Sequence, residues 1–325
     1  MSIVIHTDIG GPHGLGHAVR MRALADTLQQ RGQAVHFTTS SPDLPAFVAP
    51  FPCEVTPGPT CLAPEVLVID TKAAGWATDQ DCLATVRAQG IRLAQVDTPG
   101  ATPNACDLLI APVAHWEPGV VDRLRQAFGE RFLYGWPYVM VRGSDPGVAT
   151  PHEPYVLCCA GGSDPDQVMQ RYVGWLRESP LDVPAVLALG SHAPLPAMGA
   201  RGAMNRVVLT RFTPRLLHHA ALVVTTFGVT AYECLAARVP ALLLARHRAD
   251  WDASLWLTLA AGHRVAPLGL VETMTAAHFR RGVHSILSNP RQGETMRLPL
   301  RELDGYGVGR VAAALCSLSR EGATA

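Results

Sequence analysis

The chain has 325 residues, of which 48% are hydrophobic and 17% are charged, and its 27 basic side chains balance 27 acidic ones. This composition is typical of a compact globular protein, and the length predicts two domains. A net charge of zero offers no bulk attraction to nucleic acid or to an anionic membrane surface, so we expect neither as a partner.

Eight cysteines are present, with no C-x-x-C pair and no metal-ligand spacing. We therefore expect buried, reduced thiols and no metal site. Residues 1–6 lack the basic and apolar regions of a signal peptide, and no apolar run approaches the length that spans a bilayer. These features predict a cytoplasmic protein that is not transmembrane.

In the first half, short apolar runs alternate with segments of helical period, a pattern typical of parallel sheets with crossover helices. Strands are predicted at 3–7, 35–38, 66–70, 92–96 and 108–111, and helices at 17–31, 79–89 and 117–128. The proline-rich stretch 41–64 is predicted to have little regular structure.

A dense cluster of glycine, proline and polar residues at 143–154 predicts a domain boundary, with one domain over 1–145 and a second over 152–325. The second half repeats the alternation. Its predicted strands are 155–159, 183–188, 206–209, 222–225 and 240–244, and its predicted helices are 164–178, 214–219, 228–237, 250–261 and 275–287. A last helix at 308–320 can pack back onto the first domain. Because ligands of open parallel sheets bind beyond the carboxyl ends of the strands, two such domains predict a ligand cleft between them.

The first strand runs into its helix through residues 14–17, Gly-Leu-Gly-His. Such a turn aims backbone N–H groups and the positive helix end at a ligand above the sheet, and His17 adds a side chain that titrates near neutrality. A dinucleotide fingerprint is the rival interpretation, but Val19 occupies its third glycine position and no acid follows the strand at 35–38. The plain alternative for His17 is local packing at a helix start.

A second glycine-rich turn, residues 161–164 (Gly-Gly-Ser-Asp), follows the strand at 155–159. Glycines permit close backbone approach, and Ser163 or Asp164 can cap the following helix. Because an aspartate repels an anion, Ser163 and the N–H groups of Gly161 and Gly162 are the better phosphate donors. A simple strand-to-helix turn is the alternative.

Residues 225–233 form the third motif, at the start of another helix. Thr226, Gly228 and Thr230 can cradle a diphosphate, and Glu233 can accept hydrogen bonds from ribose hydroxyls. Thr230 and Glu233 also have the spacing of a capping box. Both interpretations suit Thr230, but Glu233 cannot fully serve both.

Together these motifs resemble the GT-B nucleotide-sugar enzymes, most closely the UDP-sugar hydrolase of pseudaminic acid biosynthesis and its spore-coat-polysaccharide relatives. The pattern Gly14-x-Gly16-His17-x-x-Arg20-x-x-x-Leu24-Ala25 carries the resemblance in the first half, and residues 161–164 and 226–233 carry it in the second. The second half also resembles the peptidoglycan N-acetylglucosaminyltransferase. The resemblance covers about residues 3–266 and implies two Rossmann-like, open parallel-sheet domains that face a central cleft.

The resemblance implies a role for each motif. His17 would be the catalytic residue of a sugar- and acceptor-side domain, and the second domain would bind the nucleotide. The implied nucleotide and diphosphate contacts are Gly16, Gly161, Gly162, Ser163, Arg211, Phe212, Thr226, Gly228, Thr230 and Glu233, with Arg211 and Phe212 beside the base. On the sugar side we expect Asp8, Arg20, Asp70, Asp97, Asp252 and Ser254.

The activity predicted first is hydrolysis of a nucleotide sugar, with UDP as the favoured nucleotide. His17 would deprotonate a water that attacks the anomeric carbon, and backbone N–H groups would stabilise the departing diphosphate without a metal or other cofactor. The alternative is a glycosyltransferase that uses the same donor site with a small or lipid acceptor. A third possibility is a nucleotide-sugar-binding module without chemistry.

Overall fold

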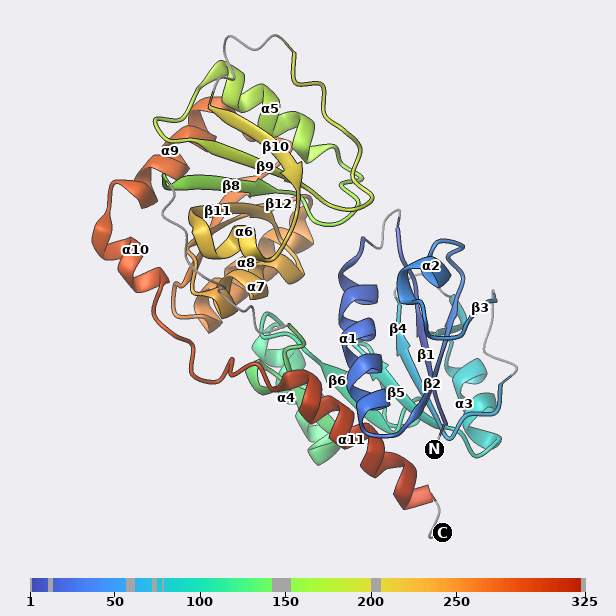
Figure 1. Cartoon of the computed structure of the whole chain (residues 1–325). Coiled ribbons are helices and arrows are strands. Elements are labelled where there is room, and N and C mark those ends of the chain that lie inside the picture. The colour runs from blue at the N-terminus through green and yellow to red at the C-terminus, as the bar shows by residue number, and fades with distance from the viewer. Residues whose placement is uncertain are drawn as a thin grey trace. The chain divides into compact units, whose positions relative to one another are not determined.

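The computed structural model describes residues 2–10, 14–56, 62–71, 75–77, 79–141, 153–199 and 206–322. The chain divides into two compact units, which are drawn in Figure 1. Unit 1 comprises Met1–Val141 and Glu302–Ala325, and unit 2 comprises Arg142–Arg301. The division falls next to the boundary cluster predicted at 143–154, most of which lies outside the described residues.

Unit 1 contains a seven-stranded parallel sheet in the order β3-β2-β1-β4-β5-β6-β7. The strands are β1 (Ser2–Thr7), β2 (Ala34–Thr39), β3 (Cys53–Val55), β4 (Val66–Asp70), β5 (Arg92–Val96), β6 (Leu108–Ala111) and β7 (Phe132–Tyr134). The helices are α1 (Gly16–Gln30), α2 (Leu44–Val48), α3 (Gln80–Ala88), α4 (Pro118–Phe128) and α11 (Gly307–Gly322). The five strands predicted for this half are confirmed.

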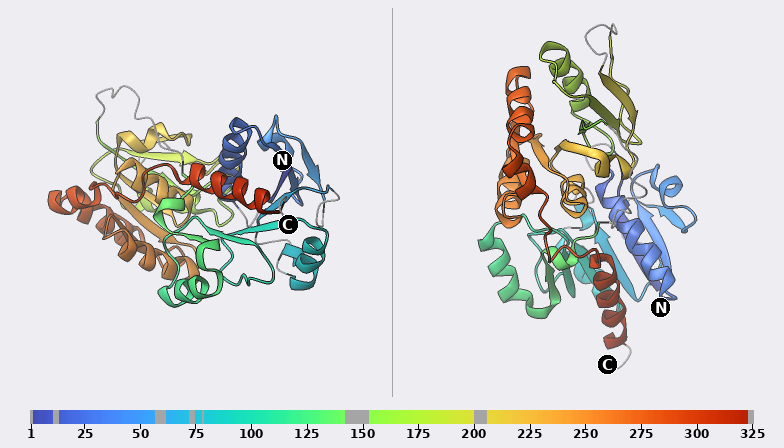
Figure 2. Two further views of the ribbon diagram at one scale, coloured as in Figure 1. Left: turned by 90° about the horizontal axis from the view of Figure 1, so that it is seen from below. Right: turned by 60° about the vertical axis from the view of Figure 1, so that its left-hand side comes forward.

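Helix α11 packs against α1 on one face of this sheet, as Figures 1 and 2 show. Leu315 is fully buried in the core that α1 forms with β1, which stabilises the fold by about 1.5–3 kcal/mol. A Cβ on Gly307 would lie 2.1 Å from the carbonyl oxygen of Val139. Only glycine therefore lets α11 start this close to the backbone at Val139. The last helix therefore belongs to unit 1.

The prediction of little regular structure over 41–64 is wrong in part. Residues 44–48 form α2, in which a proline occupies the first helical turn, where its missing N–H costs nothing. Residues 53–55 form β3, the edge strand that pairs with β2.

Unit 2 contains a six-stranded parallel sheet in the order β10-β9-β8-β11-β12-β13. The strands are β8 (Tyr155–Cys159), β9 (Ala185–Leu189), β10 (Val207–Arg211), β11 (Ala220–Thr226), β12 (Ala241–Ala245) and β13 (Val265–Leu270). The helices are α5 (Val168–Glu178), α6 (Arg215–His219), α7 (Val229–Ala237), α8 (Arg248–Ala260), α9 (Ala276–Leu287) and α10 (Pro290–Met296). Strand β13 and helix α10 were not predicted.

Both faces of this second sheet are covered. Tyr172 of α5 and Phe279 of α9 pack together over one face, with ring centroids 5.8 Å apart. The Tyr172 hydroxyl donates to the carbonyl oxygen of Val224, so the buried phenol is satisfied. Consecutive residues Leu157 and Cys158 of β8 are both fully buried, which explains why the strands read as unbroken apolar runs.

Because all paired strands are parallel, their carboxyl ends gather at one edge of each sheet. The turns after β1, β4 and β5 lie at that edge in unit 1, and those after β8, β9 and β11 lie at it in unit 2. Among the described residues, no helix combines the length and the apolar character needed to cross a bilayer.

Candidate active site

A histidine and an aspartate meet at the carboxyl edge of the unit 1 sheet. His17 lies in the first turn of α1, and its Nδ1 is 2.6 Å from Oδ1 of Asp70, the last residue of β4. Asp70 is fully buried, whereas the His17 side chain keeps 16% of its surface exposed. The imidazole is therefore anchored on one side and accessible on the other.

Arg20, one turn along α1, completes this cluster. Its Nε donates to Asp70 Oδ2 at 2.6 Å and its Nη2 donates to Asp70 Oδ1 at 2.5 Å, a bidentate pair. The same Nη2 lies 3.6 Å from Oδ2 of Asp97, which follows β5. The Arg20 side chain is only 6% exposed, so its guanidinium is used within unit 1 rather than presented to a sugar.

These contacts fix the charges of the cluster. Burial of Asp70 favours its neutral form, but the charge of Arg20, the neighbouring His17 and the hydrogen bonds from both hold the pKa of Asp70 well below its usual range. Burial likewise opposes the charge of Arg20, yet the two aspartates raise its pKa above the usual value. Asp70 is thus an ionised acceptor and Arg20 a permanent cation.

An ionised Asp70 decides which nitrogen of His17 carries hydrogen. A 2.6 Å contact between Nδ1 and a carboxylate oxygen requires a hydrogen between them, and the carboxylate has none to give. In the neutral ring Nδ1 therefore bears the hydrogen and Nε2 is the acceptor. This arrangement suits a general base that takes a proton through Nε2.

Asp8, expected on the sugar side, is used elsewhere. It follows β1 and is 1% exposed, and it accepts hydrogen bonds from the hydroxyls of Thr39, Ser40, Ser41 and Thr71 and from the N–H of Ser40. Despite burial, these bonds lower its pKa to about 2. Its carboxylate ties the ends of β1, β2 and β4 together.

In unit 2, the turn of residues 161–164 is shaped by a close contact with Gly190, which follows β9. A Cβ on Gly190 would lie 2.3 Å from the carbonyl oxygens of both Gly161 and Gly162, so both oxygens face Gly190. In a trans peptide the N–H points opposite to the C=O, so the N–H groups of Gly162 and Ser163 face the other side. Two successive N–H groups aimed one way form an anion-binding concavity.

The two polar side chains of this turn, Ser163 and Asp164, have different surroundings. Asp164 accepts from the N–H groups of Val168 and Met169 at 2.8 and 2.9 Å, so it caps α5. The hydroxyl oxygen of Ser163 is buried and has no hydrogen-bond partner among the described residues. The Ser163 hydroxyl is therefore free to hydrogen-bond a ligand or a water at this turn.

The motif at residues 225–233 lies beside that turn. A Cβ on Gly161 would be 3.9 Å from Thr226 Oγ1, so the two predicted diphosphate elements meet. Gly228, with φ of +159°, is the N-cap of α7 and makes no side-chain cap. Thr230 therefore lies inside the first turn, and the predicted capping box does not form.

Glu233 lies one turn further along α7 and is half-buried. Burial raises its pKa, and a hydrogen bond from the Thr230 side chain partly offsets that rise. Because no side chain caps α7, the Glu233 carboxyl group does not cap the helix.

The remaining predicted ligand contacts differ in their burial and in the partners that their side chains already have. Arg211, the last residue of β10, donates to the carbonyl oxygen of Gly190 at 2.8 Å, next to the glycine-rich turn, and Phe212 follows it half-buried. Asp252 pairs with Arg248 on α8, with a 3.0 Å distance between Nε and Oδ1. Ser254 is fully buried, and its hydroxyl donates to a carbonyl of its own helix. Ser254 is therefore not available to a sugar.

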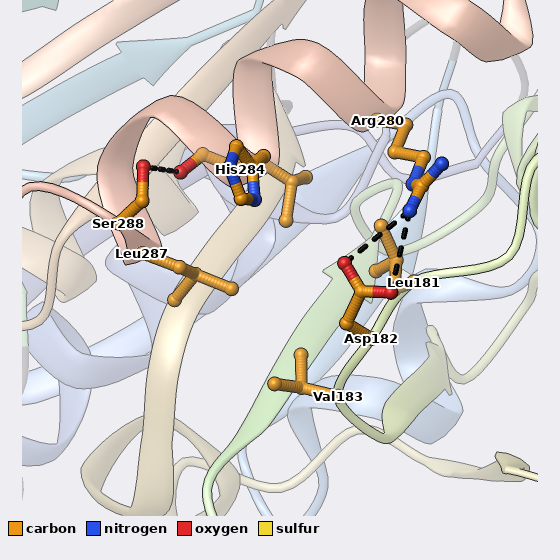
Figure 3. Close-up of a pocket in the computed structure, with 8 residues that line it drawn as sticks. Leu181, Asp182, Val183, Arg280, His284, Leu287 and Ser288 are labelled. Atoms are coloured by element: carbon orange, nitrogen blue, oxygen red, sulfur yellow. Dashed lines mark hydrogen bonds and ion pairs between the residues drawn. The ribbon is translucent and has the colours of Figure 1, made fainter.

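A pocket of about 220 Å³ lies at the opposite edge of the unit 2 sheet (Figure 3). Leu181, Val183 and Leu287 give it apolar walls, and Arg280 pairs with Asp182 at its side, with 3.3 Å between Nη2 and Oδ1. Because residues 181–183 precede β9, this pocket lies away from the turns that follow the strands, and it has no part in the site.

Two features of the site were not foreseen. The role of Gly190 depends on a contact with a turn about thirty residues away, and its only sequence signal is a glycine directly after a strand. The pairing of Arg20 with Asp70 was also missed, although both residues were candidates for the site.

The sequence matches no protein-family model, and comparison with curated proteins finds no match. Solved structures do match. The glycotransferase of kitacinnamycin has a TM-score of 0.70 at 16% identity, covering 98% of both chains. The calicheamicin glycosyltransferase CalG4 has a TM-score of 0.64 at 14% identity, covering 97% of this chain and 98% of its own. The UDP-GlcNAc 2-epimerase of Neisseria meningitidis bound to UDP-GlcNAc has a TM-score of 0.60 at 10% identity, covering 98% of this chain and all of its own. With two Rossmann-like, open parallel-sheet units and these neighbours, the chain has the GT-B fold.

Proposed function

We propose that the protein is a nucleotide-sugar enzyme that transfers a glycosyl group from a nucleoside-diphosphate sugar, most simply a UDP-sugar, to a hydroxyl acceptor. Unit 2 binds the nucleoside diphosphate, and His17 of unit 1 supplies the base. The observation that carries the proposal is the contact of His17 Nδ1 with the buried Asp70, which leaves Nε2 as a proton acceptor on an accessible imidazole.

The transfer step needs only the acceptor hydroxyl, the sugar diphosphate and the His17 imidazole. The acceptor hydroxyl gives its proton to His17 Nε2 while its oxygen attacks the anomeric carbon. The bond from that carbon to the diphosphate oxygen breaks, and its electron pair leaves with the diphosphate. Proton transfer of this kind contributes about 10²- to 10⁴-fold in rate.

The leaving diphosphate needs stabilisation, and the turn of residues 161–163 supports this role. The N–H groups of Gly162 and Ser163 face one side, and the Ser163 hydroxyl lacks a partner among the described residues. Removing one preorganised donor from such a site typically costs about 10²- to 10³-fold in rate. Glu233 is proposed to accept the ribose hydroxyls.

Two of the three structural neighbours described above are named as glycosyltransferases, and the third holds a UDP-sugar. These names favour transfer to a hydroxyl acceptor. Hydrolysis is the second candidate, because the motif from Gly14 to Ala25 resembles the UDP-sugar hydrolase family. In hydrolysis, water takes the place of the acceptor and the role of His17 is unchanged.

The test is incubation of the enzyme with a panel of nucleotide sugars in ¹⁸O-water, with and without alcohol acceptors. Transfer predicts that nucleoside diphosphate is released only when an acceptor is present. Label at C1 of the released sugar would support hydrolysis instead. Label in phosphate, or turnover that yields only an epimeric nucleotide sugar, would contradict attack on the anomeric carbon by an external oxygen.

His17→Asn removes the proposed base in this assay, because asparagine is a polar side chain that cannot accept the proton. Release of nucleoside diphosphate should fall by about 10²-fold or more. Unchanged turnover in this variant would remove His17 from the mechanism.

A further inference from the structure

Arg20 is a buried cation in direct contact with the proposed base and its partner. Its Nη2 lies 3.0 Å from His17 Nδ1 and 2.5 Å from Asp70 Oδ1. Because Nδ1 carries a hydrogen, the contact with Nη2 is not a hydrogen bond. It is the approach of two donors to one carboxylate oxygen.

We propose that Arg20 is a positioning residue that sets the proton affinity of His17, by orienting Asp70 through a bidentate pair and by balancing the negative charge of Asp70 and Asp97. This inference rests on the proposed function for its catalytic consequence. Its electrostatic part stands on the geometry of unit 1.

The physical need for such a residue follows from the charges. A carboxylate beside an imidazole favours the imidazolium form, and a protonated ring cannot act as a base. Asp70 contacts His17 directly, and Asp97 adds a second negative charge close to Arg20. With Arg20 present, the two carboxylates and one guanidinium carry a net charge of −1 instead of −2.

The bidentate geometry adds a second effect. Arg20 Nε and Nη2 each hold one oxygen of Asp70, so the plane of the carboxylate is fixed and Oδ1 is directed at both Nη2 and His17 Nδ1. A lysine could supply the charge but not the paired contacts. The two effects can therefore be separated by substitution.

Other charged groups near α1 are engaged elsewhere. Asp8, which follows β1, accepts from the hydroxyls of Thr39, Ser40 and Thr71. Arg22 of α1 pairs with Asp26 on the same helix. Arg310 of α11 pairs with Asp304. His17 contacts Asp70 of β4 and Arg20 of α1, and Asp97 contacts Arg20.

The test compares variants whose effects should have opposite signs. Arg20→Gln removes the cation and should move the titration midpoint of the His17 imidazole to higher pH by about 1 unit. Asp97→Asn removes an anion and should move it to lower pH. Asn suits this position because Asp97 has φ of +56°, a conformation that asparagine tolerates.

The midpoint is read in the full-length protein without substrate, from ¹⁵N resonances of labelled histidine assigned by their loss in His17→Asn. Arg20→Lys should stay close to the wild-type midpoint while kcat falls, because it keeps the charge and loses the paired contacts. If Arg20→Gln does not fold, the His17 midpoints of Arg20→Lys and Asp97→Asn still test the inference. Midpoints that do not move, or that move in the same direction in Arg20→Gln and Asp97→Asn, would overturn the inference.

Activity separates this inference from the proposed function. The acid limb of the kcat/KM profile should follow the midpoints measured by NMR. Opposite shifts in the NMR midpoints without matching shifts in the pH–rate profile would leave the electrostatic role of Arg20 intact and contradict His17 as the base.

Discussion

Gly190→Ala tests the geometry of the proposed diphosphate turn. Gly190 is buried after β9, and a Cβ there would lie 2.3 Å from the carbonyl oxygens of Gly161 and Gly162 and 2.5 Å from the carbonyl carbon of Gly162. All three atoms are backbone, so no side-chain rotation relieves the clash. The turn of residues 161–163 must move instead.

The size of the effect follows from these distances. Ordinary contact needs a separation of more than 3 Å, so the turn must shift by about 1 Å, at a cost of about 1–3 kcal/mol in the free energy of unfolding. The same shift misaligns the N–H groups of Gly162 and Ser163. Loss of one hydrogen bond to a charged group costs about 1.5–3 kcal/mol, so UDP affinity should fall by about tenfold to a hundredfold.

The assay is urea unfolding followed by calorimetric titration with UDP. Gly174→Ala is the matched control, because Gly174 is exposed in the middle of α5 and its added Cβ would meet nothing within 4 Å. That variant should be more stable than wild type by about 0.5–1 kcal/mol and bind UDP equally well. Wild-type affinity in Gly190→Ala would refute the assignment of this turn to the diphosphate.

Three further predictions concern single side chains. Asp70→Asn should lower turnover by about 10²- to 10⁴-fold through loss of the Nδ1–H tautomer of His17, while UDP affinity, measured by calorimetry, stays at the wild-type value. Glu233→Gln should weaken UDP binding by about tenfold or more but leave the affinity for 2′,3′-dideoxy-UDP, which lacks both ribose hydroxyls, unchanged, and equal losses for both ligands would disprove the ribose contact. His6 is fully buried, and burial lowers its pKa from 6.5 to about 4, although Asp8 opposes the shift. The pKa of His6 is lower in the folded protein than in the unfolded chain. Neutral His6 therefore contributes to the free energy of unfolding above pH 6.5, and this contribution is lost as the pH falls toward 4. Urea unfolding at pH 7 and pH 5 should therefore show a larger loss in wild type than in His6→Gln.

The central strands could be predicted because both of their faces are buried. β4 and β6 read as apolar runs with clear ends, and their predicted bounds match the structure. Three edge strands, β3, β7 and β13, lack that signal. β13 contains Pro267 and Gly269, which weaken a strand pattern, and β7 has only three residues. Their pairing depends on a neighbouring strand that is already in place.

The site could be predicted only as far as turns and residue types allow. The positions of His17, Gly161 and Thr226 at strand-to-helix turns follow from local pattern, and parallel strands bring them to the sheet edge. Which carboxylate contacts His17 does not follow, because Asp8, Asp70 and Asp97 all lie at carboxyl ends of strands in one sheet. Tertiary packing selects Asp70 and engages Asp8 with neighbouring hydroxyls.

The capping box at Thr230 illustrates a different limit. The spacing from Thr230 to Glu233 fits a helix that starts after Thr230, but α7 starts at Val229 with Gly228 as its N-cap. Helix boundaries are uncertain by one or two residues, and that error decides whether Glu233 caps the helix or is available to a ligand.

The most direct test of the account compares His17→Ala with wild type in two measurements on one UDP-sugar that the enzyme uses. Because His17 is proposed to act in chemistry and unit 2 to bind the nucleotide, Kd should stay within about twofold while kcat falls by about 10²-fold or more. Turnover equal to wild type would show that the imidazole is not the base. Loss of binding with retained kcat would show that residue 17 belongs to the nucleotide site instead.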